Sequence, residues 1–278
     1  MYHILLGEFF KFYKRPIALF ITIFTVVIFI LAVSFMSTVQ MTENGVTTYR
    51  MMKYLTFPMA GYVGVEIASK MMSFLVLIMI ASLLGNEYGW NTHKTIAIRG
   101  TDKLQFINSK LIAVFIFVVF LSLLGIGVFA LLAYFMQSEI LTHVQPDTTL
   151  PGYFVPAYFL LFLFSVLLYL TAGLFTTVLT KSSGLGIAVT MVYFFVAESI
   201  LKFILTLLAV KYGKWLDDIS FYLPGELMGK ILDDTTLTAG GIQDYWSAIV
   251  KPLLASGAFS ILFYIGSLAI IKKRDILN

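Results

Sequence analysis

The chain of 278 residues contains no cysteine and few charged residues, and both shortages limit what it can be. Without cysteine there is no structural disulfide, no thiolate metal site and no cysteine nucleophile. Charged residues make up 12% of the sequence, whereas soluble domains have about 25%. Hydrophobic residues make up 59%, which is more than so few charged side chains can shield from water. The composition therefore indicates a protein whose surface faces mostly lipid.

Catalytic and nucleotide-binding motifs are also missing. The segment from Gly225 to Ile231 is one spacer short of a phosphate-binding loop and lacks the serine or threonine that would hold Mg²⁺. The three histidines are scattered along the chain, and neither a His-Glu-x-x-His motif nor a Gly-x-Ser-x-Gly elbow occurs. We therefore expect that the chain is not an enzyme and carries no metal site and no cofactor of its own.

Six apolar segments are long enough to cross about 30 Å of hydrocarbon, which takes roughly 20 helical residues. Four of them contain no charged residue, and each of the other two contains one Glu and one Lys. Strict alternation of apolar and polar residues is absent, which excludes a membrane β-barrel. We predict an all-α membrane protein, a single transmembrane domain over residues 1–278, with spans at residues 17–38, 63–85, 111–136, 155–179, 185–210 and 253–271.

Lysine and arginine are unevenly distributed between the two sides that these spans define. Eleven lie on the side that holds both termini, residues 86–110 and residues 180–184, and six lie on the other side. An excess of these residues is typical of the cytoplasmic side of a membrane. We therefore predict that both termini are cytoplasmic. The net charge of +4 is too small to suggest a nucleic-acid partner.

Residues 1–16 precede the first span and show a helical repeat of apolar side chains. Polar or small residues recur on the opposite face, so we predict an amphipathic lead helix in the inner headgroup layer, in contact with membrane lipid. It serves either to anchor the first span or to contact a cytoplasmic partner, and the sequence favours neither. The apolar face carries Tyr2, Leu5, Leu6, Phe9 and Tyr13, and the other face carries His3, Gly7, Lys11 and Arg15.

Two segments between spans are longer than a simple connection needs. Residues 86–110 form the largest cytoplasmic loop, with a short apolar patch at residues 95–98. A solvated connector is one interpretation, but connections longer than about 12–15 residues are usually functional or disordered. This one is too apolar for disorder, so we favour a docking element. Residues 211–252 we interpret as short amphipathic or re-entrant helices that cap the extracellular side.

Two of the predicted spans carry ionisable residues. Glu66 and Lys70 are four residues apart, and so are Glu198 and Lys202, with Glu first in each case. This spacing and order suit an ion pair within one helix. Two interpretations stay open: self-neutralised pairs, or a polar lining of a substrate path or subunit seam, since charges inside a membrane usually face the protein interior. Coupling to an ion gradient is a third, weaker option.

Three groups of residues form a recognisable order along the chain. They are the lead segment Gly7-Glu8-Phe9-Phe10-Lys11-Phe12-Tyr13-Lys14-Arg15-Pro16, the loop residues Glu87, Gly89, Thr92-His93-Lys94, Arg99, Phe106 and Lys110-Leu111, and the closing Lys272-Lys273-Arg274-Asp275-Ile276. In this order they resemble the ABC-2 class of ABC transporter permeases, in the bacterial subgroup whose ATPase is a separate chain. The loop between spans five and six, with Tyr222-Leu223-Pro224, is also similar to that class.

The resemblance implies a multi-pass protein of the bacterial cell membrane that works as an exporter subunit. Two permeases, identical or related, would form the substrate path, and each would rest on an ABC ATPase that binds ATP and Mg²⁺. The loop after span two would be the coupling helix, with Glu87, Gly89, Lys94 and Arg99 at the ATPase contact. We expect Ile96 and Ile98 to supply the apolar centre of that contact, since interface centres are depleted in charge.

Two other functions stay open. An ion-coupled secondary transporter would use Glu66 and Glu198 as ion sites, although the chain shows no inverted repeat with broken helices. A non-transporting membrane protein, such as a sensor or an immunity protein, is the other. Members of the ABC-2 class export lipids, polysaccharides, peptides, antibiotics or ions, and the sequence does not select among these.

Overall fold

The computed structural model describes residues 2–39, 41–43, 46–48, 51–89, 103–144, 154–213, 215–220, 222–231 and 250–273. Helices account for nearly all of these residues, and six helical segments are long and apolar enough to cross a membrane. The predicted all-α membrane protein with six spans is therefore confirmed. The predicted coupling helix falls largely on residues 90–102, which lie outside the described residues.

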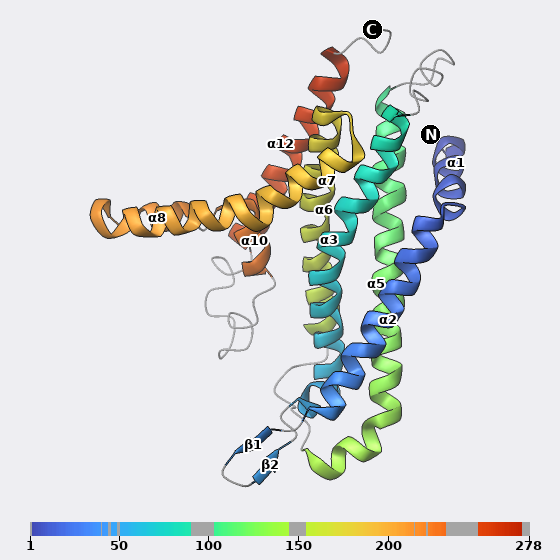
Figure 1. The fold of residues 1–278 in the computed structure, drawn as a ribbon, viewed down its shortest axis with the longest axis vertical. Helices are drawn as coiled ribbons and strands as arrows, with labels where there is room; N and C mark the ends of the chain where they lie inside the picture. The colour runs from blue at the N-terminus through green and yellow to red at the C-terminus, as the bar shows by residue number, and fades with distance from the viewer. Residues whose placement is uncertain are drawn as a thin grey trace. The chain divides into compact units, whose positions relative to one another are not determined.

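Figure 1 shows the elements, whose bounds in chain order are as follows. They are α1 (Tyr2–Tyr13), α2 (Pro16–Thr38), β1 (Met41–Glu43), β2 (Val46–Thr48), η1 (Met52–Leu55), α3 (Met59–Gly89), α5 (Lys103–His143), α6 (Phe154–Thr180), α7 (Ser183–Met191), η2 (Val192–Ala197), α8 (Glu198–Tyr212), α9 (Trp215–Ser220), α10 (Pro224–Ile231) and α12 (Lys251–Lys273).

The chain divides into two compact units, and α3, α5 and α6 each contribute residues to both. The first unit contains Met1–Phe12, Ser73–Ile116 and Leu163–Asn278. The second contains Tyr13–Met72 and Phe117–Phe162. Each unit is described separately below.

In the second unit, close packing depends on one aromatic ring of α2. Phe29 is fully buried, and a Cβ at Gly125 of α5 would overlap its ring. The ring of Phe129, one helical turn further along α5, meets Phe29 edge to face at 6.2 Å between centroids. Glycine at position 125 is therefore needed for the close approach of α2 and α5. Helix α2 itself begins at Pro16, a position where the missing N–H of proline costs little.

The second unit also holds a short antiparallel hairpin formed by β1 and β2. Met41 pairs with Thr48, and Glu43 pairs with Val46. The two residues between the last pair are Asn44 and Gly45, the dipeptide most favoured in two-residue hairpin connections. The hairpin is an addition to the predicted all-α fold.

In the first unit, small residues allow helices to pack closely on α6. A Cβ at Gly173 would come within 2.8 Å of the Ile80 side chain of α3. The ring of Phe175 meets that of Phe263 of α12 in a tilted arrangement at 5.8 Å between centroids, with Gly266 of α12 beside it. Of the most apolar 18-residue stretch of α3, 61% is buried.

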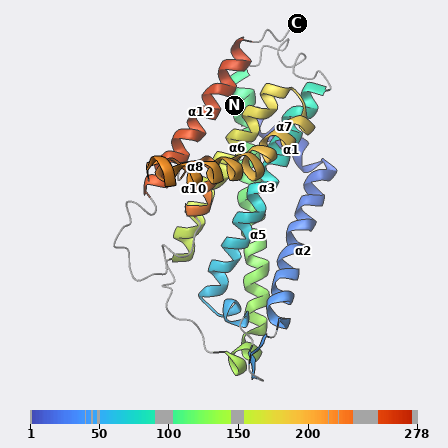
Figure 2. The same ribbon diagram turned by 60° about the vertical axis from the view of Figure 1, so that its left-hand side comes forward.

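The fifth predicted span, residues 185–210, is not one uninterrupted α-helix. The segment Ser183–Tyr212 comprises α7, the π-helical stretch η2 and α8, and Gly213 ends it with a φ of 114°. Figures 1 and 2 show α8 running crosswise to α6 and α12. Short π-helical stretches inside α-helices occur often at functional sites. Hydropathy predicted the length of this span but gave no sign of its change in helix type.

Spans five and six are far less buried than α3. Only 11% of the most apolar 18-residue stretch of Ser183–Tyr212 is buried, and the share is the same for Lys251–Lys273. Large apolar side chains such as Phe195, Phe203 and Ile261 are exposed on them. In a membrane protein such surfaces face lipid or another subunit. Lipid tails are as apolar as these side chains, so the side chains need not be buried inside the protein.

Short helices are present in the predicted extracellular cap. Helices α9 and α10 fall within residues 211–252, while residues 232–249 lie outside the described part of the chain. Helix α10 packs against α12 and η2, and its Leu227 is fully buried. The prediction of short helices here agrees with the structure, and their role as a cap stays a prediction.

Candidate functional site

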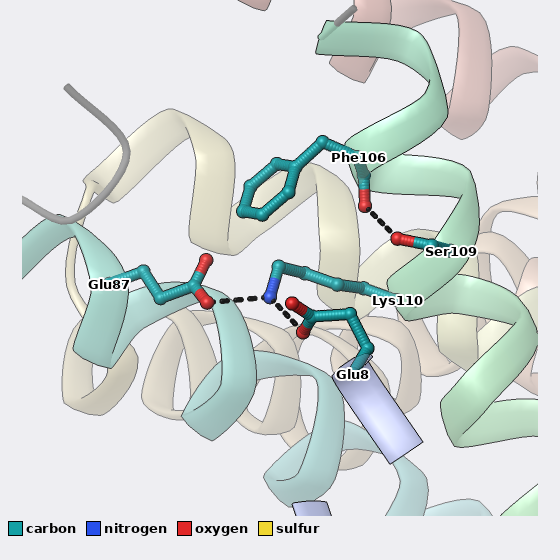
Figure 3. Close-up of polar contacts among 5 residues, drawn as sticks. All are labelled: Glu8, Glu87, Phe106, Ser109 and Lys110. Atoms are coloured by element: carbon teal, nitrogen blue, oxygen red, sulfur yellow. Dashed lines mark hydrogen bonds and ion pairs between the residues drawn. The ribbon is translucent and has the colours of Figure 1, made fainter. Parts of the chain in front are cut away.

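Three ionisable side chains meet inside the first unit, next to the predicted coupling loop (Figure 3). The Lys110 Nζ donates hydrogen bonds to Glu8 Oε2 at 2.6 Å and to Glu87 Oε1 at 2.7 Å. Glu8 comes from α1, Glu87 from the last turn of α3, and Lys110 from the second turn of α5. We call Glu8, Glu87 and Lys110 the ion triad.

The ion triad is almost completely removed from solvent. The Lys110 side chain is 0% exposed, Glu8 4% and Glu87 7%. A charge in such a place is costly unless it is paired and hydrogen-bonded, and removal of one partner from a buried pair is strongly destabilising. Because the two glutamates share one ammonium group, that group fastens three helices at a single point.

Side chains of α5 complete the surroundings of Lys110. The Phe106 ring lies one turn before it, with the ring centroid 4.4 Å from Nζ, an arrangement that favours a cation. The Ser109 hydroxyl donates to the Phe106 carbonyl oxygen at 2.7 Å. The Ser109 hydroxyl is therefore bonded within α5. The Phe106 ring is the group of α5 that interacts with the charge of Lys110.

Residues directly before Glu87 make a second close contact. A Cβ at Gly85 would overlap the backbone of Ser183, the first residue of α7. Beside it, the Ser183 hydroxyl donates to Asn86 Oδ1 at 3.5 Å. The α3 backbone therefore touches the start of α7 at Gly85, two residues before α3 reaches Lys110 through Glu87.

The turn between α6 and α7 is fixed by hydroxyl groups. The Thr176 hydroxyl lies 2.5 Å from the Thr190 hydroxyl, and the Thr190 hydroxyl also donates to the Gly186 carbonyl oxygen at 2.7 Å. Ser182 caps α7 through a hydrogen bond from Leu185 N. The Thr176 hydroxyl, which also donates to the Gly186 carbonyl oxygen at 3.2 Å, joins α6 to α7, whereas the other two bonds lie within α7 and its cap.

Among the residues that the structure describes, no group of three or more His, Asp or Glu side chains is placed to hold a metal ion. Each polar group named above pairs with another group of the protein. The chemistry that this site offers is the attachment of helices to one another.

The structure places the six predicted ATPase-contact residues unequally. Glu87 is buried and bonded to Lys110, so its carboxylate is engaged inside the protein. Gly89 is the exposed last residue of α3, with no atom near its Cβ position. Lys94, Ile96, Ile98 and Arg99 lie outside the described residues. A role of these residues in an ATPase contact stays a prediction.

Of the two predicted intrahelical ion pairs, the first is present. Lys70 Nζ donates to Glu66 Oε1 within α3, and the Lys70 side chain is 75% exposed. The first interpretation, a pair that neutralises itself, therefore applies to these two residues. The other interpretation, that these two residues line a substrate path or a subunit seam, stays a prediction.

The second predicted pair, Glu198 with Lys202, is wrong. Lys202 Nζ bonds to Glu226 Oε2 at 2.7 Å, and the buried Glu198 accepts a hydrogen bond from Gly225 N at 2.6 Å. Gly225 belongs to the first turn of α10, whose free N–H groups and dipole attract a carboxylate. Each residue therefore bonds to α10 and not to the residue four positions away in its own helix. The partner of Lys202 lies 24 residues further along the chain, and the partner of Glu198 lies 27 residues further along.

The ion triad itself escaped the sequence analysis. Glu8, Glu87 and Lys110 all lie in the segments on which the resemblance to ABC-2 permeases rests, so a signal for their importance was present. Their mutual pairing was not visible, because Glu8 and Lys110 are 102 residues apart and no periodicity links them.

The apolar helices and the internally paired charges define a multi-pass membrane protein. A family model described as ABC-2 family transporter protein matches residues 4–197, which is more than half of the chain. The chain therefore belongs to the ABC-2 family of transporter proteins. No curated protein and no solved structure matched it.

Proposed function

We propose that the chain is the permease subunit of an ATP-driven exporter in a bacterial cell membrane. The observation that carries this proposal is the family match over residues 4–197, which covers most of α1, the first four spans and the predicted coupling loop. A second permease, identical or related, would complete the substrate path. A separate ATPase, with its ATP and Mg²⁺, would supply the energy.

The ion triad supports the assignment of residues 86–110 as the ATPase contact. Glu87 and Lys110 stand at the two ends of this segment and are bonded to each other at 2.7 Å. A loop whose ends are joined inside the protein can pass a force to the helices that carry it. A loose connector would absorb the same force.

The test of this proposal is affinity purification of the tagged chain from its native membrane. Recovery of a soluble ATPase in a stoichiometric amount is the expected result. Substrate uptake that depends on an ion gradient without ATP would instead indicate a secondary transporter. With neither result, the chain is a non-transporting membrane protein and the proposal fails.

The proposed orientation has its own test, because the chain has no native cysteine. Single cysteines at Asp147 or Asp233 should react with an impermeant reagent added outside intact cells. Cysteines at Thr101 or Asn278 should react only after the membrane is opened. Labelling of Thr101→Cys from outside would reverse the proposed orientation and place residues 86–110 out of reach of a cytoplasmic ATPase.

A further inference from the structure

We propose that Lys110 is a positioning residue that makes the lead helix α1 and the base of residues 86–110 one moving part. This inference rests on the proposed function, because it concerns how an ATPase-driven movement would spread. It assigns to α1 a role that is neither a plain membrane anchor nor an independent partner contact.

The first step concerns the base of the loop. Helix α3 ends at Gly89 and α5 begins at Lys103, so Glu87 and Lys110 flank the segment between them. Their hydrogen bond of 2.7 Å is buried. The two ends of the loop therefore cannot separate unless the buried Glu87–Lys110 pair is broken, which would leave both charges without a partner and shielded from water.

The second step adds α1. Glu8 bonds to the same Nζ at 2.6 Å, so one ammonium group holds α1 and α3 to α5. Leu6 and Phe10, which flank Glu8 in sequence, are exposed. Helix α1 thus turns the Glu8 carboxylate into the protein, while these two apolar side chains face outward. Its attachment at this point is ionic.

The third step extends the joint to span five. Gly85 and Asn86 contact Ser183 at the start of α7. Three consecutive residues of α3, from Gly85 to Glu87, therefore reach α7, α5 and, through Lys110, α1. A displacement of the loop base would move α1 and the start of span five together.

A matched pair of substitutions separates this role from general stability. Glu8→Gln removes the charge that attaches α1 to Lys110 and reduces the ion pair to a neutral acceptor, while it leaves the Glu87–Lys110 bond in place. Glu66→Gln is the same change in an exposed Lys–Glu pair on α3. Spin labels at Leu6→Cys and Gln105→Cys, two exposed sites in α1 and α5, report the distance between α1 and the loop base.

The distance is measured in nanodiscs, first for the chain alone. A single narrow distribution is expected for the otherwise unchanged chain and for Glu66→Gln, and a broader or longer one for Glu8→Gln. Lys110→Arg, which keeps the cation, should stay narrow. An unchanged narrow distribution in Glu8→Gln would overturn the inference, because other contacts would then hold α1.

The same labels are then read in the complex with its co-purified ATPase, trapped by ATP, Mg²⁺ and vanadate. The distance should stay constant on trapping in the chain with native Glu8 and change in Glu8→Gln. A change on trapping with native Glu8 would show that α1 and the loop base move separately. Absence of an ATPase would overturn the proposed function, whereas the measurement on the chain alone tests the joint independently.

Discussion

Two arrangements of lysine and glutamate in this protein differ in nearly every physical respect. Lys70 and Glu66 are one turn apart on α3, and Lys70 is 75% exposed. Lys110 is 0% exposed and joins residues that are 23 and 102 positions away in the sequence. The first arrangement was found in the sequence by its spacing, and the second was found only in the structure.

From this comparison we expect that the ion pair easiest to predict contributes less to the stability of the fold. A pair within one helix forms whether or not the rest of the protein is assembled, and water screens most of its attraction. A buried pair between helices exists only in the folded state, and its loss leaves a charge without a partner in a poor solvent. The following predictions test this contrast, from the largest expected effect to the smallest.

The largest effect is expected for Lys110→Met. The change leaves two carboxylates together in a buried place without their cation, which should lower the free energy of unfolding by about 3–5 kcal/mol. The measurement is the unfolding of the protein in detergent, monitored through the loss of helix content. The triple variant Glu8→Gln, Glu87→Gln, Lys110→Met removes all the charges and should recover most of the loss. A triple variant no more stable than Lys110→Met would contradict the electrostatic explanation.

The contact beside the ion triad is tested at two glycines of the same helix. Gly85→Ala places a methyl group against the Ser183 backbone, so α3 and α7 must separate, at a cost of about 1–3 kcal/mol. Gly89→Ala meets no atom within 4 Å, and a change at such a surface site should stay within about 0.5 kcal/mol. Equal unfolding midpoints for the two variants would mean that the close approach of α3 and α7 is not tight.

A third prediction distinguishes the observed partner of Lys202 from the expected one. In a double-mutant cycle, Lys202→Met with Glu226→Gln should show a coupling of about 0.2–1 kcal/mol, because the pair is partly exposed. Lys202→Met with Glu198→Gln should show a smaller coupling. The pairing expected from the sequence predicts instead that this second double variant is milder than either single change, and that result would favour the original assignment.

The smallest effect is expected for Lys70→Met. Exposed ion pairs contribute about 0.2–1 kcal/mol, and the attraction weakens as salt is added. The unfolding midpoint should therefore shift little at low salt and less at high salt. A loss comparable with that of Lys110→Met would remove the contrast between buried and exposed pairs.

The sequence predicted the six spans because hydropathy is a local property that is summed over about 20 residues. The predicted third span, residues 111–136, lies within a longer helix, α5 (Lys103–His143). Two polar residues near the start of α5 have partners in the fold. Lys110 has the ion triad, and Asn108 accepts a hydrogen bond from the Tyr264 hydroxyl of α12 at 2.6 Å. Hydropathy cannot detect such partners.

The candidate site was predictable only in part. The resemblance singled out Glu87, and the structure shows that this carboxylate faces Lys110 and Glu8 inside the protein. The partner of Glu198 was missed because α10 follows a turn whose direction the sequence does not specify. The Asn44-Gly45 signal of the hairpin, in contrast, was present in the sequence and was overlooked.

The central claim is that residues 86–110 bind the ATPase while the ion triad passes the movement on. The most direct measurement is the amount of ATPase recovered with each purified variant, after its insertion and six spans are verified. Ile96→Asp and Ile98→Asp should each abolish recovery, because a carboxylate buried in the contact would lack a partner. Arg99→Ala and the charge-free triple variant should keep the ATPase. Recovery at the unchanged level with both Ile96→Asp and Ile98→Asp would contradict the account.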